Sequence, residues 1–149
     1  MKIIHQNKKA YFNYEILEEF KAGIVLSGAE VKSIRAGHVN LKSAYVTILG
    51  GEAWLKGANI ARYPYDSRPE YDPFRVRKLL LKKAEIEKLA GKLNAQGVTL
   101  IPLAVGLEKQ YVKLVLGLAR GKKKHDKRAA IKDRETKREA ARAIQNVRR

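Results

Sequence analysis

The sequence predicts a mainly β protein, a small antiparallel β-barrel with two or three short helices and a basic C-terminal tail. Six or seven short segments rich in β-branched and aromatic residues predict the strands, and most are joined by connections short enough for hairpins. Residues 121–149 contain no aromatic residue and few apolar ones, which separates the tail from the barrel. The chain of 149 residues is long enough for one such domain with an appendage.

The first 40 residues predict a loose start, strand structure and one helix. Residues 1–10 are polar and are expected to lack fixed structure. Residues 11–26 alternate in polarity, which predicts one or two strands with a break near Ala22 and Gly23. Residues 27–37 predict a short helix, because Ser27 is a good N-cap and apolar side chains follow three residues apart.

The remaining elements of the barrel follow from turn and periodicity signals. Residues 43–63 predict two strands joined at Gly50 and Gly51, which suit a tight hairpin turn. Residues 62–74 hold three of the four prolines and predict a loop, and residues 75–83 predict a strand. Residues 84–97 predict a helix with a stripe of Ile86, Leu89, Ala90 and Leu93. Residues 98–107 and 111–119 predict two last strands. This order favours a barrel of oligonucleotide-binding-fold character over a doubly wound sheet.

The division of the chain is expected at residue 120, with a barrel domain over 1–120 and a tail over 121–149. The tail is rich in Ala, Lys and Arg, which are good helix formers. Its charged pairs at helical spacing contribute only about 0.2–0.5 kcal/mol each, and short isolated helices are marginal in water. We therefore predict a tail that is disordered when free and becomes helical on a surface.

The charge of the chain points to an anionic partner. Lys and Arg number 32 against 15 Asp and Glu, a formal charge of +17. Residues 119–149 carry 13 basic and four acidic side chains, so about half of the net charge lies in the tail. Nucleic acid is the favoured partner, with a solubilising basic surface and an anionic membrane as the alternatives. The chain has no cysteine and no apolar run near the ~20 residues that span a bilayer, so we expect a cytoplasmic protein of a reducing compartment.

The sequence gives no catalytic signature, and we expect no enzyme, no metal and no cofactor. The three histidines, His5, His38 and His125, are far apart, and no recognised motif of closely spaced ligands is present. Residues 117–123, "GLARGKK", differ from a phosphate-binding loop in the spacing of the glycines and lack its Ser or Thr. An acid–base site assembled from scattered carboxylates stays as an alternative.

Local clusters of charge suggest where a nucleic acid would bind. Residues 7–10, "NKKA", and the helix cluster of Glu30, Lys32 and Arg35 are candidates. A solvated arm explains the first equally well, and a charged outer face is the favoured interpretation of the second. Arg75 and Arg77 would lie on one face of a strand, with Val76 and Lys78 on the other. Guanidinium groups at that spacing suit phosphates or stacked bases. In the proline-rich loop, Tyr65 and Tyr71 are the aromatic rings expected to be exposed for stacking.

Taken in order, these segments resemble the SsrA-binding protein family, also called small protein B. The resemblance rests on "NKKAYFNYEILEEFKAGIVLSGAEVKSIRAGHVNL", "DPFRVRKLLLKKAEIEKL", "GVTLIPL" and "GLARGKKKHDKRAAIKDR", and it covers nearly the whole chain. It implies an RNA-binding adaptor without enzymatic activity. Such an adaptor binds the tRNA-like domain of transfer-messenger RNA and delivers it to stalled ribosomes in trans-translation.

The resemblance also implies two sets of contact residues. The RNA-facing set, on the barrel and the base of the tail, would comprise Asn7, Lys8, Glu30, Lys32, Arg35, Asn40, Arg75, Arg77, Lys78 and Lys123. The tail would occupy the empty decoding centre and the mRNA channel through His125, Asp126, Lys127, Arg128, Lys132, Arg134 and Ile144.

The implied partners are transfer-messenger RNA and the ribosome, whose small-subunit rRNA forms the decoding centre. Alanyl-tRNA synthetase and elongation factor Tu would be reached indirectly through the RNA, and the protein would be a monomer. Two rival hypotheses are a general basic nucleic-acid binder and an RNA-modifying enzyme.

Overall fold

A computed structural model describes residues 1–68 and 70–122. These residues form three helices and nine strands. The helices are α1 (Lys8–Asn13), α2 (Gly28–Arg35) and α3 (Lys83–Lys92). The strands are β1 (Lys2–Gln6), β2 (Tyr14–Ile24), β3 (Val39–Asn40), β4 (Tyr45–Leu49), β5 (Glu52–Lys56), β6 (Asn59–Ile60), β7 (Arg77–Leu80), β8 (Val98–Glu108) and β9 (Tyr111–Gly121).

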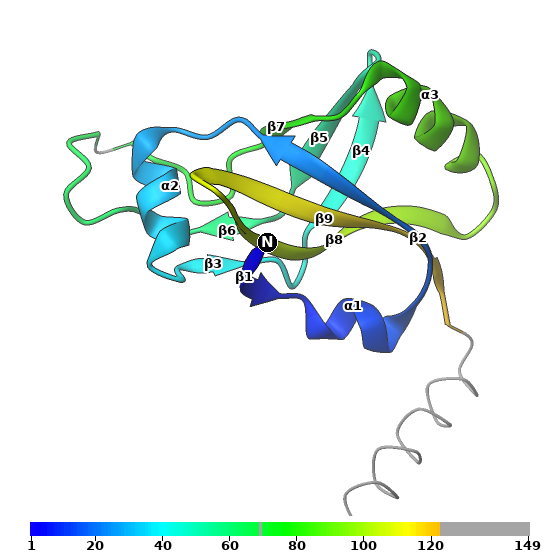
Figure 1. The fold of residues 1–149 in the computed structure, drawn as a ribbon, viewed down its shortest axis with the longest axis horizontal. Coiled ribbons are helices and arrows are strands. Elements are labelled where there is room, and N and C mark those ends of the chain that lie inside the picture. Colours follow the sequence, from blue (N-terminus) through cyan, green and yellow to red (C-terminus); the bar gives the residue numbers. More distant parts are fainter. Residues whose placement is uncertain (69, 123–149) are drawn as a thin grey trace, which may run out of the picture.

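Seven strands form one antiparallel sheet that closes on itself. The hydrogen-bonded order is β1-β8-β4-β5-β7-β2-β9, and β9 also pairs with β8, which makes a ring of six strands with β1 attached to β8. The short strands β3 and β6 form a separate pair. In Figure 1 α1 lies below the long strands β8 and β9, α2 lies beside β3 and β6, and α3 lies at the far end. The predicted mainly β, antiparallel and barrel-like fold is confirmed.

Tight turns close the two hairpins that the sequence predicts most directly. Gly50 and Gly51 have φ angles of 62° and 73° between β4 and β5, the left-handed conformation that this two-residue turn requires. The turn between β8 and β9 contains no glycine. Lys109 takes the left-handed conformation there, with a φ angle of 57°.

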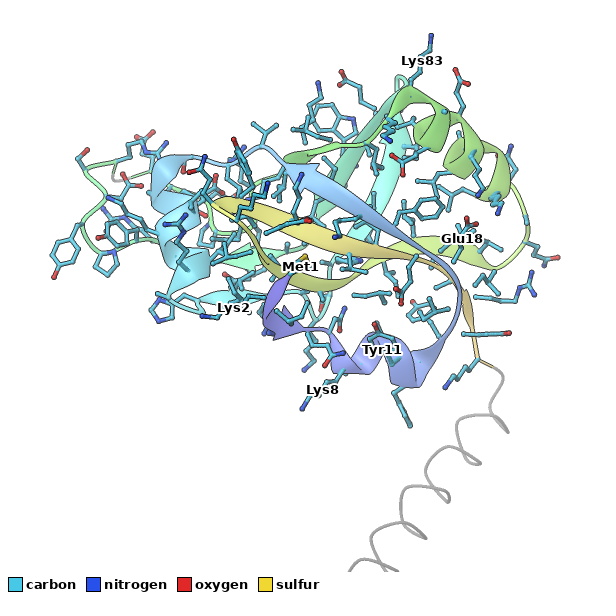
Figure 2. The ribbon with its side chains drawn as sticks, in the orientation of Figure 1. Met1, Lys2, Lys8, Tyr11, Glu18 and Lys83 are labelled. Carbon is cyan, nitrogen blue, oxygen red and sulfur yellow. The ribbon has the colours of Figure 1, made fainter. Side chains whose placement is uncertain are left out.

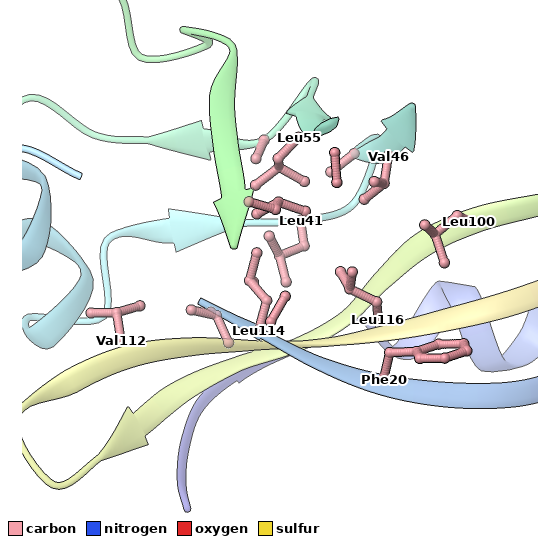
Figure 3. Packing of buried hydrophobic residues seen from close by; sticks show 14 of the residues in the cluster. Phe20, Leu41, Val46, Leu55, Leu100, Val112, Leu114 and Leu116 are labelled. Atoms are coloured by element: carbon pink, nitrogen blue, oxygen red, sulfur yellow. The ribbon is translucent and has the colours of Figure 1, made fainter. Parts of the chain in front are cut away.

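The hydrophobic core fills the ring. Leucine, valine and alanine side chains from the ring strands meet in its interior, with Leu100, Leu114 and Leu116 almost completely buried (Figure 3). A smaller cluster lies under α1, where Ala10 packs on Ile101 and Leu103 of β8. Burial of this apolar surface supplies the main favourable free energy of folding, and α1 gains its place by covering the outer face of β8.

The structure corrects the predictions for the first 26 residues. The first ten residues are not loose: β1 pairs with β8 from Lys2 opposite Leu107 to Gln6 opposite Ala104, and α1 follows. Strand β2 is continuous through Ala22 and Gly23, because β9 pairs with it along its length. The irregularity lies earlier, as a bulge between Ile16 and Glu18. A polar segment is ordered here by backbone pairing across more than 90 residues, which local patterning does not reveal.

Helix α3 packs one leucine against the barrel and is tied to β2 by charge. Leu89 is fully buried, and Lys88 and Lys92 make ion pairs of 2.5 and 2.6 Å with Glu18. The predicted helix is confirmed, although Ala90 is exposed rather than part of the buried stripe. The helix ends at Lys92, earlier than predicted.

The last described strand ends at the first residue of the predicted tail. Strand β9 runs to Gly121, and the Lys122 backbone N–H donates to the Asn13 carbonyl at 3.0 Å. The predictions for residues 123–149, including disorder and induced helix, lie outside the described residues. No helix in the described part of the chain combines the length and apolar character needed to cross a membrane.

We expect Leu89→Ala to lower the free energy of unfolding by about 2–5 kcal/mol, because it leaves a cavity beneath α3. Glu18→Gln should change it little, because the ion pairs of Glu18 are solvent-exposed and screened. Urea denaturation of the two variants measures the difference. A larger loss for Glu18→Gln than for Leu89→Ala would show that charge, not packing, holds α3.

Candidate nucleic-acid interface

Helix α2 begins with a capping box that fixes Glu30. The Ser27 hydroxyl accepts a hydrogen bond from the Glu30 backbone N–H at 3.2 Å, and the Glu30 carboxylate accepts one from the Ser27 backbone N–H at 3.0 Å. This arrangement satisfies two backbone donors at the start of the helix. The predicted cap at Ser27 is confirmed. The helix start therefore holds the Glu30 side chain toward the interior, where it is only 1% exposed.

Glu30 meets two arginines. Its Oε2 atom lies 2.6 Å from Nε of Arg77, whose side chain is completely buried, and its Oε1 atom pairs with Nη2 of Arg75. Arg77 also donates to the carbonyls of Ala58 and Pro73, both at 3.0 Å. A buried charge is tolerated only when it is paired and hydrogen-bonded, and here both members of the buried pair meet that condition.

Tyr71 connects the proline-rich loop to this pair. Its hydroxyl accepts a hydrogen bond from Nη2 of Arg77 at 2.8 Å and donates to the Ile60 carbonyl at 2.8 Å. The hydroxyl also lies 3.2 Å from the Glu30 carboxylate. The loop, helix α2 and strand β7 therefore share one polar cluster, defined by Glu30, Tyr71, Arg75 and Arg77, which we call the Glu30 cluster.

The protonation of the Glu30 cluster follows from its contacts. Burial raises the pKa of Glu30, but the Ser27 N–H and the guanidinium groups of Arg75 and Arg77 outweigh it and hold the pKa at about 2. Burial is also the largest influence on Tyr71 and raises the pKa of its hydroxyl. At neutral pH the cluster thus contains one carboxylate, two guanidinium groups and a neutral hydroxyl.

A hollow of about 760 Å³ opens beside the Glu30 cluster, between the start of α2 and the loop. Arg75 is 43% exposed at its edge and Arg68 is 55% exposed. Arg68 donates to the Ser27 hydroxyl at 3.2 Å and pairs with Asp66. The lining also includes the exposed Glu70 and Asp72, so the hollow presents both cationic and anionic side chains.

The exposed side of α2 adds two further cations. The Lys32 ammonium lies 5.2 Å from the centre of the Tyr63 ring, a cation–π contact that directs this side chain over the loop. Arg35 is exposed and donates one hydrogen bond of 3.2 Å, to the carbonyl of Gln110. Helix α2 thus carries exposed cations at Lys32 and Arg35, and Arg68 and Arg75 add two more beside its start; we call these four residues the α2 surface.

The other residues predicted to face RNA are divided between surface and interior. Lys8 projects from α1 into solvent (Figure 2), whereas Asn7 is buried. Asn40 is exposed. Lys78 makes an ion pair of 2.9 Å with Glu52. Lys123 and the predicted decoding-centre residues, His125, Asp126, Lys127, Arg128, Lys132, Arg134 and Ile144, lie outside the described residues.

The arginine pair and the tyrosines refine the predictions for this surface. Arg75 precedes β7 instead of lying in it, yet both arginines point toward Glu30, as expected for side chains on one face. Arg77 and Glu30 are buried, so RNA contact by either of them stays a prediction. Tyr65 is 85% exposed, as predicted. Tyr71 is not a free stacking ring, because its hydroxyl is held in the Glu30 cluster. Nothing in the sequence indicates that the Tyr71 hydroxyl takes part in this cluster.

The described residues contain no group of three or more His, Asp and Glu side chains arranged to hold a metal ion. The carboxylate of Glu30 is neutralised by arginines and is withdrawn from solvent. Its arrangement suits a structural role. A catalytic acid or base would need a pKa near the working pH.

The SmpB protein family model matches residues 4–146. SsrA-binding proteins of Bacillus cereus and Bacillus anthracis are each 50% identical to this chain over 145 residues, which is 97% of this chain and 94% of those proteins. A solved structure described as "tmRNA-SmpB: a journey to the center of the bacterial ribosome" is 43% identical, with a TM-score of 0.68. The structural match covers 85% of this chain and 93% of the chain in that solved structure.

We expect Glu30→Gln to be destabilised by roughly 3–5 kcal/mol at pH 7, since it leaves Arg77 buried without a counter-charge. The pKa of Glu30 is lowered from 4.5 to about 2 by folding. Its charged form therefore stabilises the fold above about pH 5, by about 3 kcal/mol, and this contribution is lost as the pH falls toward 2.

Urea denaturation at several pH values measures both effects, with Glu87→Gln on the exposed side of α3 as the control. The wild type and the control should lose stability between about pH 5 and pH 2 more steeply than Glu30→Gln. Parallel curves for all three proteins would contradict the assigned protonation.

Proposed function

Because this chain belongs to the SmpB family, we propose that it is a non-enzymatic RNA-binding adaptor of trans-translation. It binds the tRNA-like domain of transfer-messenger RNA and delivers that RNA to stalled ribosomes. The observation that carries the proposal is the extent of the likeness, because an SsrA-binding protein matches 97% of this chain at 50% identity. A shared domain alone would match only part of the chain.

The surface around α2 supports a role in binding a folded RNA. Folded RNA is recognised through its shape, its unpaired bases and its phosphates, and cations held on a rigid frame suit that recognition. We assign direct contacts to the exposed Lys32, Arg35 and Arg75. Glu30 and Arg77 are positioning residues, since they fix α2, the loop and Arg75 relative to one another.

We assign the remaining members of the RNA-facing set by the same criterion. Lys8 and Asn40 are exposed and available for contact. Lys78 can exchange its Glu52 partner for a phosphate, because the ion pair is about 40% exposed on both sides. Asn7 is a positioning residue, because it is buried.

We propose that the tail acts on the ribosome. Its base is anchored, since the Lys122 ammonium donates to the Tyr11 carbonyl at 3.1 Å and its backbone N–H donates to Asn13. Beyond Lys123, the residues His125 to Arg128 would contact the empty decoding centre. Lys132, Arg134 and Ile144 would follow into the mRNA channel. A basic segment that orders only on binding suits a channel lined by RNA.

Further partners follow from the RNA. Alanyl-tRNA synthetase and elongation factor Tu would act on the tRNA-like domain, and this protein would meet them only in the shared complex. We propose that it works as a monomer in the cytoplasm.

We expect the protein to prefer the tRNA-like domain over a generic RNA duplex at matched salt. With about six phosphate contacts, the slope of log K against log salt should be about −4 to −5. Competition binding over a range of salt concentrations measures both quantities. Equal affinity for the two RNAs would favour a general nucleic-acid binder, and a covalent change in the RNA after incubation would favour an RNA-modifying enzyme.

We expect truncation before His125 to preserve binding of the tRNA-like domain and to abolish tagging on stalled ribosomes. The described residues to which we assign RNA contacts, Lys8, Lys32, Arg35, Asn40, Arg75 and Lys78, all precede His125. Reconstituted translation of an mRNA without a stop codon measures the tagging. Tagging by the truncated protein at the wild-type rate would contradict the role assigned to the tail.

A further inference from the structure

A second cationic surface lies on α1 and on the turn at residues 41–44. Two segments without any Asp or Glu, residues 1–13 and residues 31–51, supply it. Lys8, Lys9 and Lys42 have no carboxylate partner among residues 1–68 and 70–122. Elsewhere on the barrel four lysines, Lys21, Lys78, Lys88 and Lys92, are paired with glutamates. The positive charge here is therefore uncompensated by the protein.

Asn7 and His5 bring the two segments together. The Asn7 side-chain amide donates to the carbonyls of Leu41 and Pro102, at 3.1 and 3.0 Å, and its backbone N–H donates to Leu103 at 2.7 Å. The Leu41 backbone N–H donates to Nε2 of His5 at 3.3 Å. The start of α1 is thus fastened to the turn through both polar groups of Leu41.

The turn itself holds Lys42 in place. The Asn40 side-chain oxygen accepts from the Lys42 backbone N–H at 2.8 Å, and the Ala44 backbone N–H donates to Leu41 at 3.0 Å. The turn also lies against Gly57, where a Cβ atom would come within 2.7 Å of the Ser43 carbonyl oxygen. Lys42 therefore extends from a backbone that has little freedom to move away from α1.

The consequence is a close approach of two like charges. Lys9 and Lys42 line the same hollow, and the nearby Lys42 side chain is the main cause that lowers the pKa of Lys9. Like charges at this separation repel each other. Long, exposed side chains could separate, but an anion between them would turn the repulsion into two favourable contacts.

A hollow beside the two lysines has room for more than an ion. It measures about 350 Å³ and is lined by Lys9, Lys42, Tyr45, Asn13, Ser43 and Thr99, among others. Tyr45 at the start of β4 is 46% exposed, so part of its ring surface is accessible. An exposed aromatic ring beside paired cations is the combination by which proteins bind unpaired nucleotides. The hollow shares no residue with the one beside the Glu30 cluster.

We propose that Lys9 and Lys42 together bind one phosphate of an RNA strand, and that Tyr45 stacks on the base of an adjacent unpaired nucleotide. This site deepens the proposed function and rests on it for the identity of the RNA. It assigns Asn7 and His5 as positioning residues, whose hydrogen bonds to Leu41 hold the turn that carries Lys42 against the start of α1.

The test compares Lys9→Gln, Lys42→Gln and the double variant in binding to the tRNA-like domain, with Lys83→Gln as the control. Lys83 is an exposed lysine of α3 at the opposite end of the molecule (Figure 2). Each single variant should weaken binding about fivefold and reduce the magnitude of the salt slope by about one. Because both lysines contact the same phosphate, the double variant should also reduce it by only about one.

Two outcomes of this experiment would overturn the proposal. If the magnitude of the salt slope fell by about two in the double variant, the two lysines would contact separate phosphates. Unchanged slopes in all three variants would mean that neither lysine contacts one. Tyr45→Leu should weaken binding about fivefold or more through lost stacking, whereas unchanged binding would remove the base from the site. Urea denaturation confirms that each variant is folded.

A second measurement separates this proposal from the proposed function. A uridine hexanucleotide titrated into the wild-type protein should shift the NMR signals of the Lys9 and Lys42 side chains and of the Tyr45 ring. Absence of these shifts at millimolar RNA would refute the site even if the tRNA-like domain binds. If inorganic phosphate shifted the lysine signals as much as the hexanucleotide does, and the hexanucleotide left the Tyr45 signals unshifted, the site would bind only an ion. If the wild type shows no preference for the tRNA-like domain, the proposed function fails, and the hexanucleotide still tests the site.

Discussion

The ion pair between Glu30 and Arg77 is the constraint on which the α2 surface depends. Both side chains are almost completely withdrawn from water, so each charge needs the other and each remaining donor or acceptor needs a partner. Those partners come from the start of α2, the strand segment at Ala58 and Ile60, and the loop at Tyr71 and Pro73. Removing one member would leave an unpaired charge inside the protein. The Glu30–Arg77 ion pair thus holds a helix, a loop and a strand at fixed positions. These elements in turn determine where Arg75 lies.

The distribution of the remaining charge divides the barrel surface. On β2, β7 and α3 several lysines are neutralised by glutamates, and such exposed pairs contribute little to stability. Around α2 the basic side chains outnumber the acidic ones. Around α1 the lysines have no carboxylate partner among the described residues. Uncompensated charge on a folded domain is unfavourable by itself and favours association with a polyanion. Two cationic surfaces on one barrel allow one folded RNA to be held at more than one point, which helps to fix its orientation.

Some of the fold and of the site could be predicted from sequence because the signals are local. The Gly50–Gly51 turn, the Ser27 cap and the apolar segments that form β8 and β9 each depend on residues close together in the chain. The burial of Glu30 and Arg77 could not be predicted from sequence, because 47 residues separate them and both residue types are usually exposed. The sequence predicts a free stacking ring at Tyr71 for the same reason, since nothing near it in the chain reveals that its hydroxyl accepts a hydrogen bond from the buried Arg77.

The fold class, the strand-rich order of elements, the basic character and, through its motifs, the family can all be inferred from the amino-acid sequence alone. These properties are carried by composition, periodicity and short-range spacing, which do not require the chain to be folded. The tertiary contacts were needed to show that Lys2–Gln6 pairs with β8, that Arg77 faces inward, and that Lys9 and Lys42 line one hollow. Each of these depends on contacts between segments at least 30 residues apart. Such contacts form where burial and hydrogen bonding offset the entropy of closing a long loop, and that balance belongs to the whole fold.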